Sequence, residues 1–271
     1  MSASAPPPSP SSVIIDRLRA AGCVFAEDEA RLLISAAQTP ADLAAMVDQR
    51  VSGLPLEQVL GWAEFCGLKI AVDPGVFVPR RRTEFLVGQA AALAPPQAVV
   101  VDLCCGSGAI GAALAATLDR IELHAADIDP AAVRCARRNV ATAGGQVHEG
   151  DLYQPLPAAL RGRVDVLVAS TPYVPTEEIG LLPREARMHE PRVALDGGAD
   201  GLEVLRRVAG QAPRWLAPGG HLLAETSQAQ GPAAAEIVAR AGLIARLASS
   251  GELNATVIIG TRGAREQEPG G

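Results

Sequence analysis

Residues 99–111 read Val-Val-Val-Asp-Leu-Cys-Cys-Gly-Ser-Gly-Ala-Ile-Gly, an apolar run followed by closely spaced glycines. This order predicts a buried strand, a tight loop and the first turn of a helix. Glycine lets the loop backbone turn sharply and approach a ligand closely, and the first N–H groups of the helix can donate hydrogen bonds to it. Gly106, Gly108 and Gly111 also satisfy the Gly-x-Gly-x-x-Gly pattern of dinucleotide-binding proteins, so a nicotinamide cofactor is one candidate ligand.

The part of the chain around this loop, residues 96–263, alternates short apolar runs with helical stretches. The runs lack polar alternation, which is typical of strands covered on both faces. We expect strands at 98–101, 121–126, 164–169 and 221–224, helices at 109–118 and 130–142, and an antiparallel edge hairpin at 243–249 and 255–259. The predicted fold class is α/β, with a Rossmann-like, mostly parallel sheet whose ligands bind beyond the carboxyl ends of the strands.

The preceding residues follow a different pattern. Over 13–72 the apolar residues recur mainly at helical spacing, which predicts a small α-helical domain. Thr39-Pro40-Ala41-Asp42 is typical of a helix start. Alternation over 65–77 and the turn-forming residues at 73–75 predict a hairpin that leads into a linking segment and helix, residues 73–95.

Composition limits the function classes. The chain has 271 residues, of which 48% are apolar and 20% charged, as in ordinary globular proteins. Its net charge of −6 argues against direct binding to nucleic acid or to anionic membranes. The uncharged run 103–118 is too short to span a bilayer, and the N-terminus lacks the pattern of a secretory signal. Five cysteines without a Cys-x-x-Cys pair favour a reducing cytoplasm over disulfides or a metal site. Residues 1–12 and 264–271 are expected to form disordered tails.

Acidic residues at the ends of three predicted strands decide between the candidate ligands. Asp102 closes the first strand, where a carboxylate would repel a pyrophosphate but suit a cation. Asp127 ends the next strand, where a carboxylate can accept both hydroxyls of a ribose. Asp151 and Leu152 follow a third strand, expected between the helix at 130–142 and the strand at 164–169, where an adenine edge and face would lie. A ligand with an ammonium group, a ribose and an adenine but no phosphate is S-adenosylmethionine, which this context favours over a nicotinamide cofactor.

We therefore expect S-adenosylmethionine to bind at these strand ends. The predicted contacts are Asp102, Cys104, Cys105, Gly106, Ser107, Gly108, Asp127, Asp151, Leu152 and Ser170. The two cysteines are expected to fill the loop as small side chains, because no histidine that could activate a thiol is close in sequence. Asp129, directly before Pro130, is expected to cap a helix. His124 and His221 lie within apolar strands and are expected to be core residues.

From residue 56 to residue 229 the sequence resembles the HemK/PrmC family, methyltransferases that modify the side-chain amide of a glutamine in peptide-chain release factors. The matching stretches are residues 58–61, 77–80, 83–84, 102–111, 127–130, 150–152 and 189–198. The resemblance implies a helical substrate-recognition domain before a class I methyltransferase domain, with S-adenosylmethionine as cofactor. It also implies a protein substrate, such as a release factor, and a cytoplasmic location.

One departure from the family pattern concerns the methyl acceptor. The family carries Asn-Pro-Pro-Tyr where this chain has Ser170-Thr171-Pro172-Tyr173. In the family the asparagine side chain and the next backbone carbonyl accept the N–H bonds of the substrate amide, and the tyrosine packs beside it. A serine hydroxyl is shorter and accepts a bond only while donating its own proton elsewhere. The resemblance thus assigns the acceptor site to these four residues, and the chain is most similar to a divergent relative found beside the release-factor enzyme in some bacteria.

Other functions stay open at this point. The acceptor could be another amide, an amine, a hydroxyl or a carboxylate, or the chain could bind the cofactor without catalysis. DNA adenine methyltransferases use a related Pro-Pro-Tyr loop, but the net charge disfavours them. Residues 80–82, three consecutive arginines, form either a solvated turn or a contact for an acidic partner or for the cofactor carboxylate. Glu190 is a candidate anchor for the loop that contains it.

Overall fold

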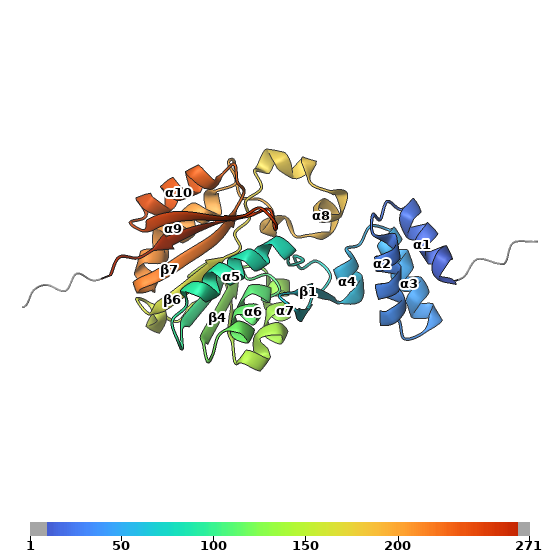
Figure 1. Ribbon diagram of the computed structural model, residues 1–271, viewed down its shortest axis with the longest axis horizontal. Helices are drawn as coiled ribbons and strands as arrows, with labels where there is room; N and C mark the ends of the chain where they lie inside the picture. Colours follow the sequence, from blue (N-terminus) through green and yellow to red (C-terminus); the bar gives the residue numbers. More distant parts are fainter. Residues whose placement is uncertain (1–9, 265–271) are drawn as a thin grey trace, which may run out of the picture.

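A seven-stranded sheet forms the centre of the computed structural model, which describes residues 10–264 (Figure 1). The strands are β3 (Val99–Leu103), β4 (Glu122–Asp127), β5 (Gln146–Glu149), β6 (Val164–Ala169), β7 (Leu216–Thr226), β8 (Ile244–Ser250) and β9 (Ala255–Thr261). Their order is β5-β4-β3-β6-β7-β9-β8. The first five are parallel, and β9 pairs antiparallel with both β7 and β8. The predicted α/β class and edge hairpin are confirmed.

Helices cover both faces of this sheet. On one face lie α5 (Glu84–Leu93), α6 (Ala109–Thr117) and α7 (Pro130–Val140), and on the other lie α9 (Glu203–Trp215) and α10 (Gly231–Arg240) (Figure 1). Every residue of β3 is buried. Val100 packs into the core under α5 and α6, whereas Val101 packs into the core under α9 and α10. Burial on both faces explains why the strand sequence lacks polar alternation.

Local capping signals are confirmed where the sequence predicted them. The Asp129 side chain accepts the N–H of Ala131 at 2.8 Å, so it caps α7 as expected. Thr39 caps α3 (Pro40–Val51) in the same way, with its hydroxyl oxygen 3.1 Å from the N–H of Asp42. Both caps follow from contacts within a few residues, which is why sequence alone was sufficient.

The topology brings the functional loops together. Strand β3 lies between β4 and β6 and runs parallel to both, so the chain leaves the carboxyl ends of all three strands at one edge. The strand order reverses at β3, which is where open α/β sheets bind ligands. Three short helices contribute residues to the cavity at this edge: η1 (Arg81–Thr83), α8 (Arg184–His189) and η5 (Arg192–Ala194). A fourth, η4 (Thr176–Leu181), lies in the chain between β6 and α8. Two further short helices, η2 (Ala141–Ala143) and η3 (Ala158–Leu160), belong to other connections.

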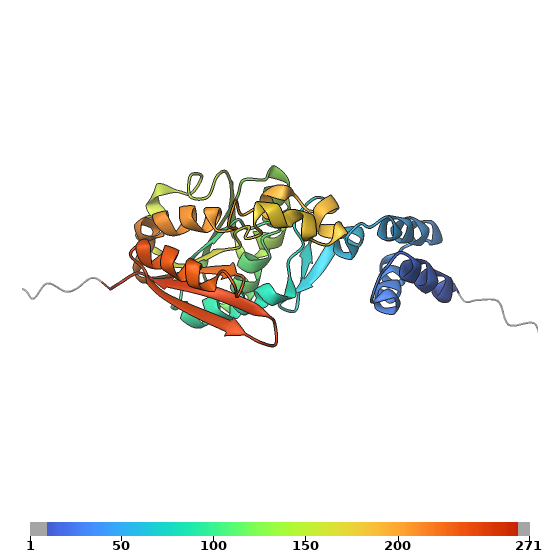
Figure 2. The same cartoon turned by 90° about the horizontal axis from the view of Figure 1, so that it is seen from above.

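The N-terminal helices form a separate small cluster at one end of the molecule (Figures 1 and 2). They are α1 (Pro10–Ala20), α2 (Ala26–Ala36), α3 and α4 (Leu56–Leu60), packed around Leu18, Leu33 and Val47. Helix α1 begins at Pro10, so residues 10–12 are helical rather than part of the expected N-terminal tail. The other residues of the two expected tails, 1–9 and 265–271, lie outside the described residues, and Ala264 has no regular structure.

The predicted hairpin exists but lies nearer the N-terminus than the sequence indicated. Strands β1 (Trp62–Phe65) and β2 (Leu68–Ala71) turn at Cys66 and Gly67, which have φ angles of 51° and 73°. Residues 73–75 form a separate turn after the hairpin. Phe65 and Ile70 are buried in the same core as α5 and α6. The hairpin therefore packs against the core under α5 and α6.

Candidate active site

A cavity of about 710 Å³ opens at the carboxyl edge of the sheet. Its walls come from the loops after β3, β4, β5 and β6, from η1, and from the segment 182–195. The wall includes most of the residues that the sequence assigned to the site: Cys104, Cys105, Gly106, Ser107, Asp127, Asp151, Leu152, Ser170, Thr171, Pro172 and Tyr173. Residues separated by up to about 70 positions along the chain thus meet around one space, as the strand order requires.

Asp127 links the end of β4 to the glycine loop. One carboxylate oxygen accepts the N–H of Gly106 at 2.8 Å, and the other accepts the N–H of Asp129 at 2.9 Å. Burial raises the pKa of Asp127, and the two N–H donors oppose that shift. A carboxylate has about four acceptor positions, so Asp127, which lines the cavity, can accept further donors.

Two predicted contacts, Asp102 and Gly108, do not line the cavity. The Asp102 carboxyl is fully buried behind the loop, where one oxygen accepts the N–H of Gly111 at 3.0 Å and the other has no partner within residues 10–264. A Cβ at Gly108 would lie 3.0 Å from the Cβ of Ala136, so this glycine permits close packing of α6 against α7. Both residues support the loop from behind. Sequence could not show this, because β3 is buried on both faces.

The two cysteines of the loop are neutral side chains at physiological pH. Burial raises the pKa of the Cys104 thiol and of the Cys105 thiol well above the ordinary value, and nearby carboxylates raise both further. A thiolate is the nucleophilic form of cysteine. Cys104 has a φ of 53°, a left-handed conformation that helps the backbone to turn toward the cavity.

A basic residue that the sequence analysis did not single out lies beside the third predicted acid. Arg207 of α9 lines the cavity and forms an ion pair with Asp151. Leu152, which directly follows Asp151, is buried and has a φ of 51°, so the backbone bends sharply at this position. The Asp151 side chain is 29% exposed, and within residues 10–264 only one of its carboxylate oxygens makes an ion pair. It can therefore still accept a hydrogen bond from a ligand.

The acceptor loop follows β6. The Ser170 N–H donates to the carbonyl oxygen of Leu103 at 3.2 Å, which fixes the start of this loop beside the glycine loop. Thr171 and Pro172 are buried, whereas Ser170 and Tyr173 are partly exposed. The Tyr173 hydroxyl contacts Arg82 and lies 3.1 Å from a carboxylate oxygen of Glu225. Burial, followed by the Glu225 charge, raises the pKa of Tyr173.

Glycines after η5 hold the acceptor loop from behind. A Cβ at Gly197 would lie 2.6 Å from the carbonyl oxygen of Pro172, and one at Gly201 would lie 2.3 Å from that of Tyr173. The side-chain amide of Gln230 also donates to the Tyr173 carbonyl oxygen at 2.9 Å. The stretch around residues 189–201 therefore fixes the backbone of the acceptor loop.

Two of the three arginines at 80–82 make internal ion pairs. Arg80 lies 2.5 and 2.6 Å from the two carboxylate oxygens of Glu190, and its guanidinium stacks 4.8 Å from the Phe77 ring centre. Arg82 lies 2.9 Å from a carboxylate oxygen of Glu225. Glu190 thus anchors its loop, as the sequence suggested. Arg81 is exposed.

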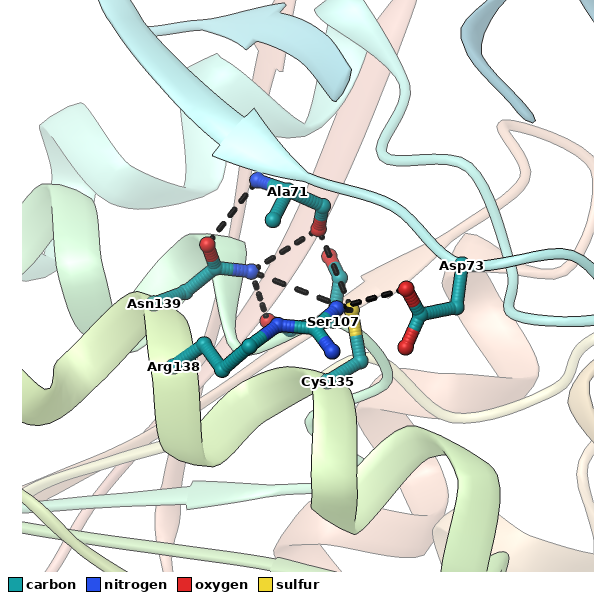
Figure 3. A network of polar contacts seen from close by, with 6 residues as sticks. All are labelled: Ala71, Asp73, Ser107, Cys135, Arg138 and Asn139. Atoms are coloured by element: carbon teal, nitrogen blue, oxygen red, sulfur yellow. Dashed lines mark hydrogen bonds and ion pairs between the residues drawn. The ribbon is translucent and has the colours of Figure 1, made fainter. Parts of the chain in front are cut away.

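Asn139 of α7 connects the hairpin to the glycine loop (Figure 3). Its side-chain amide donates to the carbonyl oxygens of Ser107 at 2.8 Å and Ala71 at 2.9 Å, and its oxygen accepts the Ala71 N–H at 2.9 Å. Arg138 forms an ion pair with Asp73 next to this network. Asn139 was not predicted from the sequence as a residue of the site. The available signal was an asparagine within a helix, a position that disfavours this residue unless its side chain finds a partner.

Comparison with known proteins identifies the family. Residues 67–181 match the family model described as methyltransferase small domain. The chain is 39% identical over 208 residues to the release factor glutamine methyltransferase of Geobacter sulfurreducens, which covers 75% of this chain and 72% of that protein. It is 35% identical over 251 residues to the release factor glutamine methyltransferase of Cereibacter sphaeroides, with coverages of 84% and 88%. The chain belongs to the release factor glutamine methyltransferase family.

Solved structures agree with the fold of this release factor glutamine methyltransferase family member. A methyltransferase from Pyrococcus furiosus superposes with a TM-score of 0.55 at 17% identity, covering 73% of this chain and 90% of that one. A ribosomal protein L11 methylase from Lactobacillus delbrueckii subsp. bulgaricus gives 0.52 at 18% identity, with coverages of 72% and 85%. The class I methyltransferase fold is therefore shown.

Two features are absent from the described residues of this family member. Within 10–264, no group of three or more His, Cys, Asp or Glu side chains is arranged to bind a metal ion. In the same part of the chain, no helix has the length and apolar character needed to cross a membrane.

Proposed function

We propose that this protein binds S-adenosylmethionine in the cavity and methylates the side-chain amide of a glutamine in a peptide-chain release factor. The observation that carries the proposal is the shared cavity: the glycine loop with Asp127 and the acceptor residues 170–173 line one space. Relatives named release factor glutamine methyltransferase, 35–39% identical over most of the chain, support the substrate class. Release factors act on cytoplasmic ribosomes, so a cytoplasmic location goes with this proposal.

The cavity walls fit the proposed cofactor. Asp127 has acceptor positions left for ribose hydroxyls, and Leu152 and Ile128 offer apolar surface for an adenine. Asp151 can accept a donor at the adenine edge. The volume of about 710 Å³ falls within the range typical of small-molecule sites. When bound there, S-adenosylmethionine supplies an electrophilic methyl group on a sulfonium.

The protein's own contribution to this reaction is orientation. The Ser170 hydroxyl and the Thr171 carbonyl are the groups that would accept the N–H bonds of a substrate amide, with the Tyr173 ring beside them. No general base is required for an amide held in this way. Glu190 and Glu225, the buried carboxylates near the acceptor loop, are both engaged by arginines, which suits them to structural roles.

Ser170 in place of asparagine lowers the rate expected for an amide acceptor, and it is also compatible with a second class of acceptor. Loss of one hydrogen bond that orients the amide raises the activation free energy by about 1–3 kcal/mol. This corresponds to a rate roughly 5- to 150-fold below that of an asparagine-containing relative. The shorter side chain also leaves room for a different nitrogen or oxygen acceptor. We therefore propose that the chain is a divergent member of the family, with glutamine as the first acceptor to test.

The N-terminal helices are proposed to recognise the protein substrate. They stand apart from the sheet domain (Figures 1 and 2) and reach the cavity wall through Arg50 of α3, whose guanidinium lies 3.2 Å from the carboxylate of Glu185 in α8. Glu185 lines the cavity. A partner bound to the helices would thus lie next to the acceptor end.

The test is methyl transfer from labelled S-adenosylmethionine to a purified release factor, with mass spectrometry to locate the methyl group. We expect slow modification of one glutamine and a 5- to 150-fold faster reaction with Ser170→Asn. Ser249→Asn, at an exposed position of the edge strand β8, serves as the control and is expected to leave the rate unchanged. The glutamine assignment fails if S-adenosylhomocysteine binds while neither the wild type nor Ser170→Asn labels the release factor. Labelling of other proteins in an extract would then identify a different acceptor, and no labelling would indicate a binding protein.

A further inference from the structure

A polar cluster behind the acceptor loop joins three separate parts of the chain. Arg82 and Thr83 come from η1, Tyr173 comes from the acceptor loop, and Glu225 comes from the end of β7. Glu225 is only 5% exposed, yet each of its oxygens has a donor. One oxygen lies 2.9 Å from the Arg82 guanidinium and 3.1 Å from the Tyr173 hydroxyl, and the other accepts the Thr83 hydroxyl at 2.6 Å.

The Tyr173 hydroxyl has no proton left for a substrate. Glu225 is acceptor-only when ionised, so the tyrosine hydroxyl must donate to it. Arg82 is donor-only, so the same hydroxyl oxygen must accept from the guanidinium. The guanidinium also lies 5.6 Å from the centre of the Tyr173 ring. These contacts leave the ring, rather than the hydroxyl, as the part of Tyr173 that acts in the cavity.

We propose that Glu225 is a positioning residue that fixes the Tyr173 ring at the acceptor end of the cavity. Arg82 neutralises the buried carboxylate, and Thr83 sets its orientation. The Gln230 amide and the close approach of Gly201 already fix the backbone of Tyr173. The contact of its hydroxyl with Glu225 therefore restricts the remaining rotation of the side chain. This inference rests on the proposed function, because the ring matters only if an acceptor is aligned there.

A positioning residue of this kind affects the rate through the alignment of the reacting groups. Displacement of a reacting group by about 1 Å can cost roughly a hundredfold in rate. Without Glu225, Tyr173 loses its acceptor, and Arg82 is free to leave the ring. Within residues 10–264, no hydrogen bond or ion pair joins Asp127 to this cluster, so we expect cofactor binding to be unchanged. The expected signature is a fall in kcat without a change in affinity for S-adenosylhomocysteine.

The first experiment compares Glu225→Ala and Glu225→Gln with the wild type in the labelled transfer assay and by calorimetry with S-adenosylhomocysteine. We expect kcat to fall about 10- to 100-fold in Glu225→Ala. Glutamine keeps an acceptor oxygen and the shape of the side chain, so Glu225→Gln should retain more of the activity. The dissociation constant should stay within about twofold of the wild type in both variants. Glu236→Ala, which removes an exposed ion-pair partner of Arg240 on α10, is the control and should change neither quantity.

A second readout needs no activity. The chain has two tyrosines, Tyr153 and Tyr173, and burial raises the pKa of both. The charged groups that act on the Tyr173 hydroxyl are Glu225, Arg82 and Arg80. Removing Glu225 leaves only the two cations, so in Glu225→Ala the absorbance of one tyrosinate should appear at lower pH than in the wild type. Repeating the titration in a Tyr153→Phe background assigns the signal to Tyr173.

The two readouts separate the possible failures. An unchanged tyrosine titration in both Glu225 variants overturns the inference, whatever the activity. A changed titration with full kcat in Glu225→Ala also overturns it, because the contact would then not position the ring for reaction. If the wild type methylates nothing, the proposed function fails, while the titration still decides whether Glu225 holds Tyr173. Should Glu225→Ala not fold, Tyr173→Phe removes the same contact and should lower kcat with unchanged cofactor affinity; full kcat in that variant overturns the inference.

Discussion

The side-chain amide of Asn139 donates to the carbonyl oxygen of Ser107 across 2.8 Å, which joins helix α7 to the glycine loop. The same side chain pairs with both backbone polar groups of Ala71 in β2 (Figure 3). One residue thus connects the hairpin, a helix and the proposed cofactor loop. The loop conformation depends on a contact made 32 residues further along the chain.

Replacement of Asn139 by alanine should therefore weaken both cofactor binding and the fold. The carbonyls of Ser107 and Ala71 lose their donor, and the Ala71 N–H loses its acceptor, so we expect the free energy of unfolding to fall by about 1–3 kcal/mol. We expect the affinity for S-adenosylhomocysteine to fall about tenfold, which corresponds to about 1.4 kcal/mol. Calorimetry and urea unfolding measure the two effects. Arg134→Ala, at an exposed position on α7, is the control, and an unchanged affinity in Asn139→Ala would show that the loop does not need this support.

Asp127 and Asp129 offer a matched pair of substitutions. Asn at position 127 keeps one acceptor oxygen, but its NH2 group would face an N–H of either Gly106 or Asp129. We expect Asp127→Asn to weaken S-adenosylhomocysteine binding by about 10- to 100-fold, since charge-assisted hydrogen bonds contribute roughly 1.5–3 kcal/mol. Asp129→Asn should bind normally, because asparagine caps helices as well as aspartate does. Equal affinities for the two variants would exclude Asp127 from the cofactor site.

The buried Asp102 predicts a specific pH dependence of stability. Burial raises the pKa of this carboxyl from its ordinary value of 3.8 to about 7. The native state therefore binds the proton more tightly than the unfolded state, and Asp102 reduces stability as the pH rises from about 4 to about 7. Each pKa unit corresponds to about 1.4 kcal/mol, so the cost above pH 7 is about 4 kcal/mol.

Asp102→Asn removes this titration, and its stability relative to the wild type should rise with pH by about 4 kcal/mol between pH 4 and pH 8. Urea unfolding at several pH values measures the difference in unfolding free energy between Asp102→Asn and the wild type. The other titrating groups are the same in both proteins, so their contributions cancel in this difference. A difference that does not vary with pH would mean that Asp102 is ionised throughout that range.

The sequence was sufficient wherever the deciding contacts are local. The apolar run before Gly106 predicted the strand and the loop, and the caps at Thr39 and Asp129 involve neighbours within three residues. The site loops could also be predicted to meet, because parallel strands bring their carboxyl ends to one edge. Side-chain direction could not be predicted for Asp102, because a strand buried on both faces has no polar side to show which way each residue points.

Ion pairs between residues far apart in the chain could not be predicted from the sequence either. Arg82 and Glu225 are 143 residues apart, and Arg80 and Glu190 are 110 apart. A run of three arginines does not show whether the side chains face solvent, bind a ligand or pair with buried carboxylates. The turn at Cys66 was missed because a Cys-Gly pair is a weaker signal than the Asp-Pro-Gly that follows at residues 73–75.

Arg50 provides the last prediction, because it is the contact through which the helical cluster meets the cavity wall. Its guanidinium binds both oxygens of Glu29, at 2.6 and 3.2 Å, and it also lies 3.2 Å from Glu185. The Arg50 and Glu29 side chains are only 11% and 10% exposed. Arg50→Met would leave a buried carboxylate without a partner, so we expect the helical cluster to lose about 3–5 kcal/mol of stability.

Two further variants distinguish loss of this ion pair from simple loss of a large side chain. Removing both charges with Arg50→Met and Glu29→Leu should restore most of the stability, because an apolar pair can replace a buried ion pair at little cost. Arg17→Met breaks an exposed pair with Asp48 and should cost at most about 1 kcal/mol. Hydrogen exchange over residues 10–60 measures the effect where it is expected. If Arg50→Met costs no more stability than Arg17→Met, the Arg50–Glu29 pair does not stabilise the cluster.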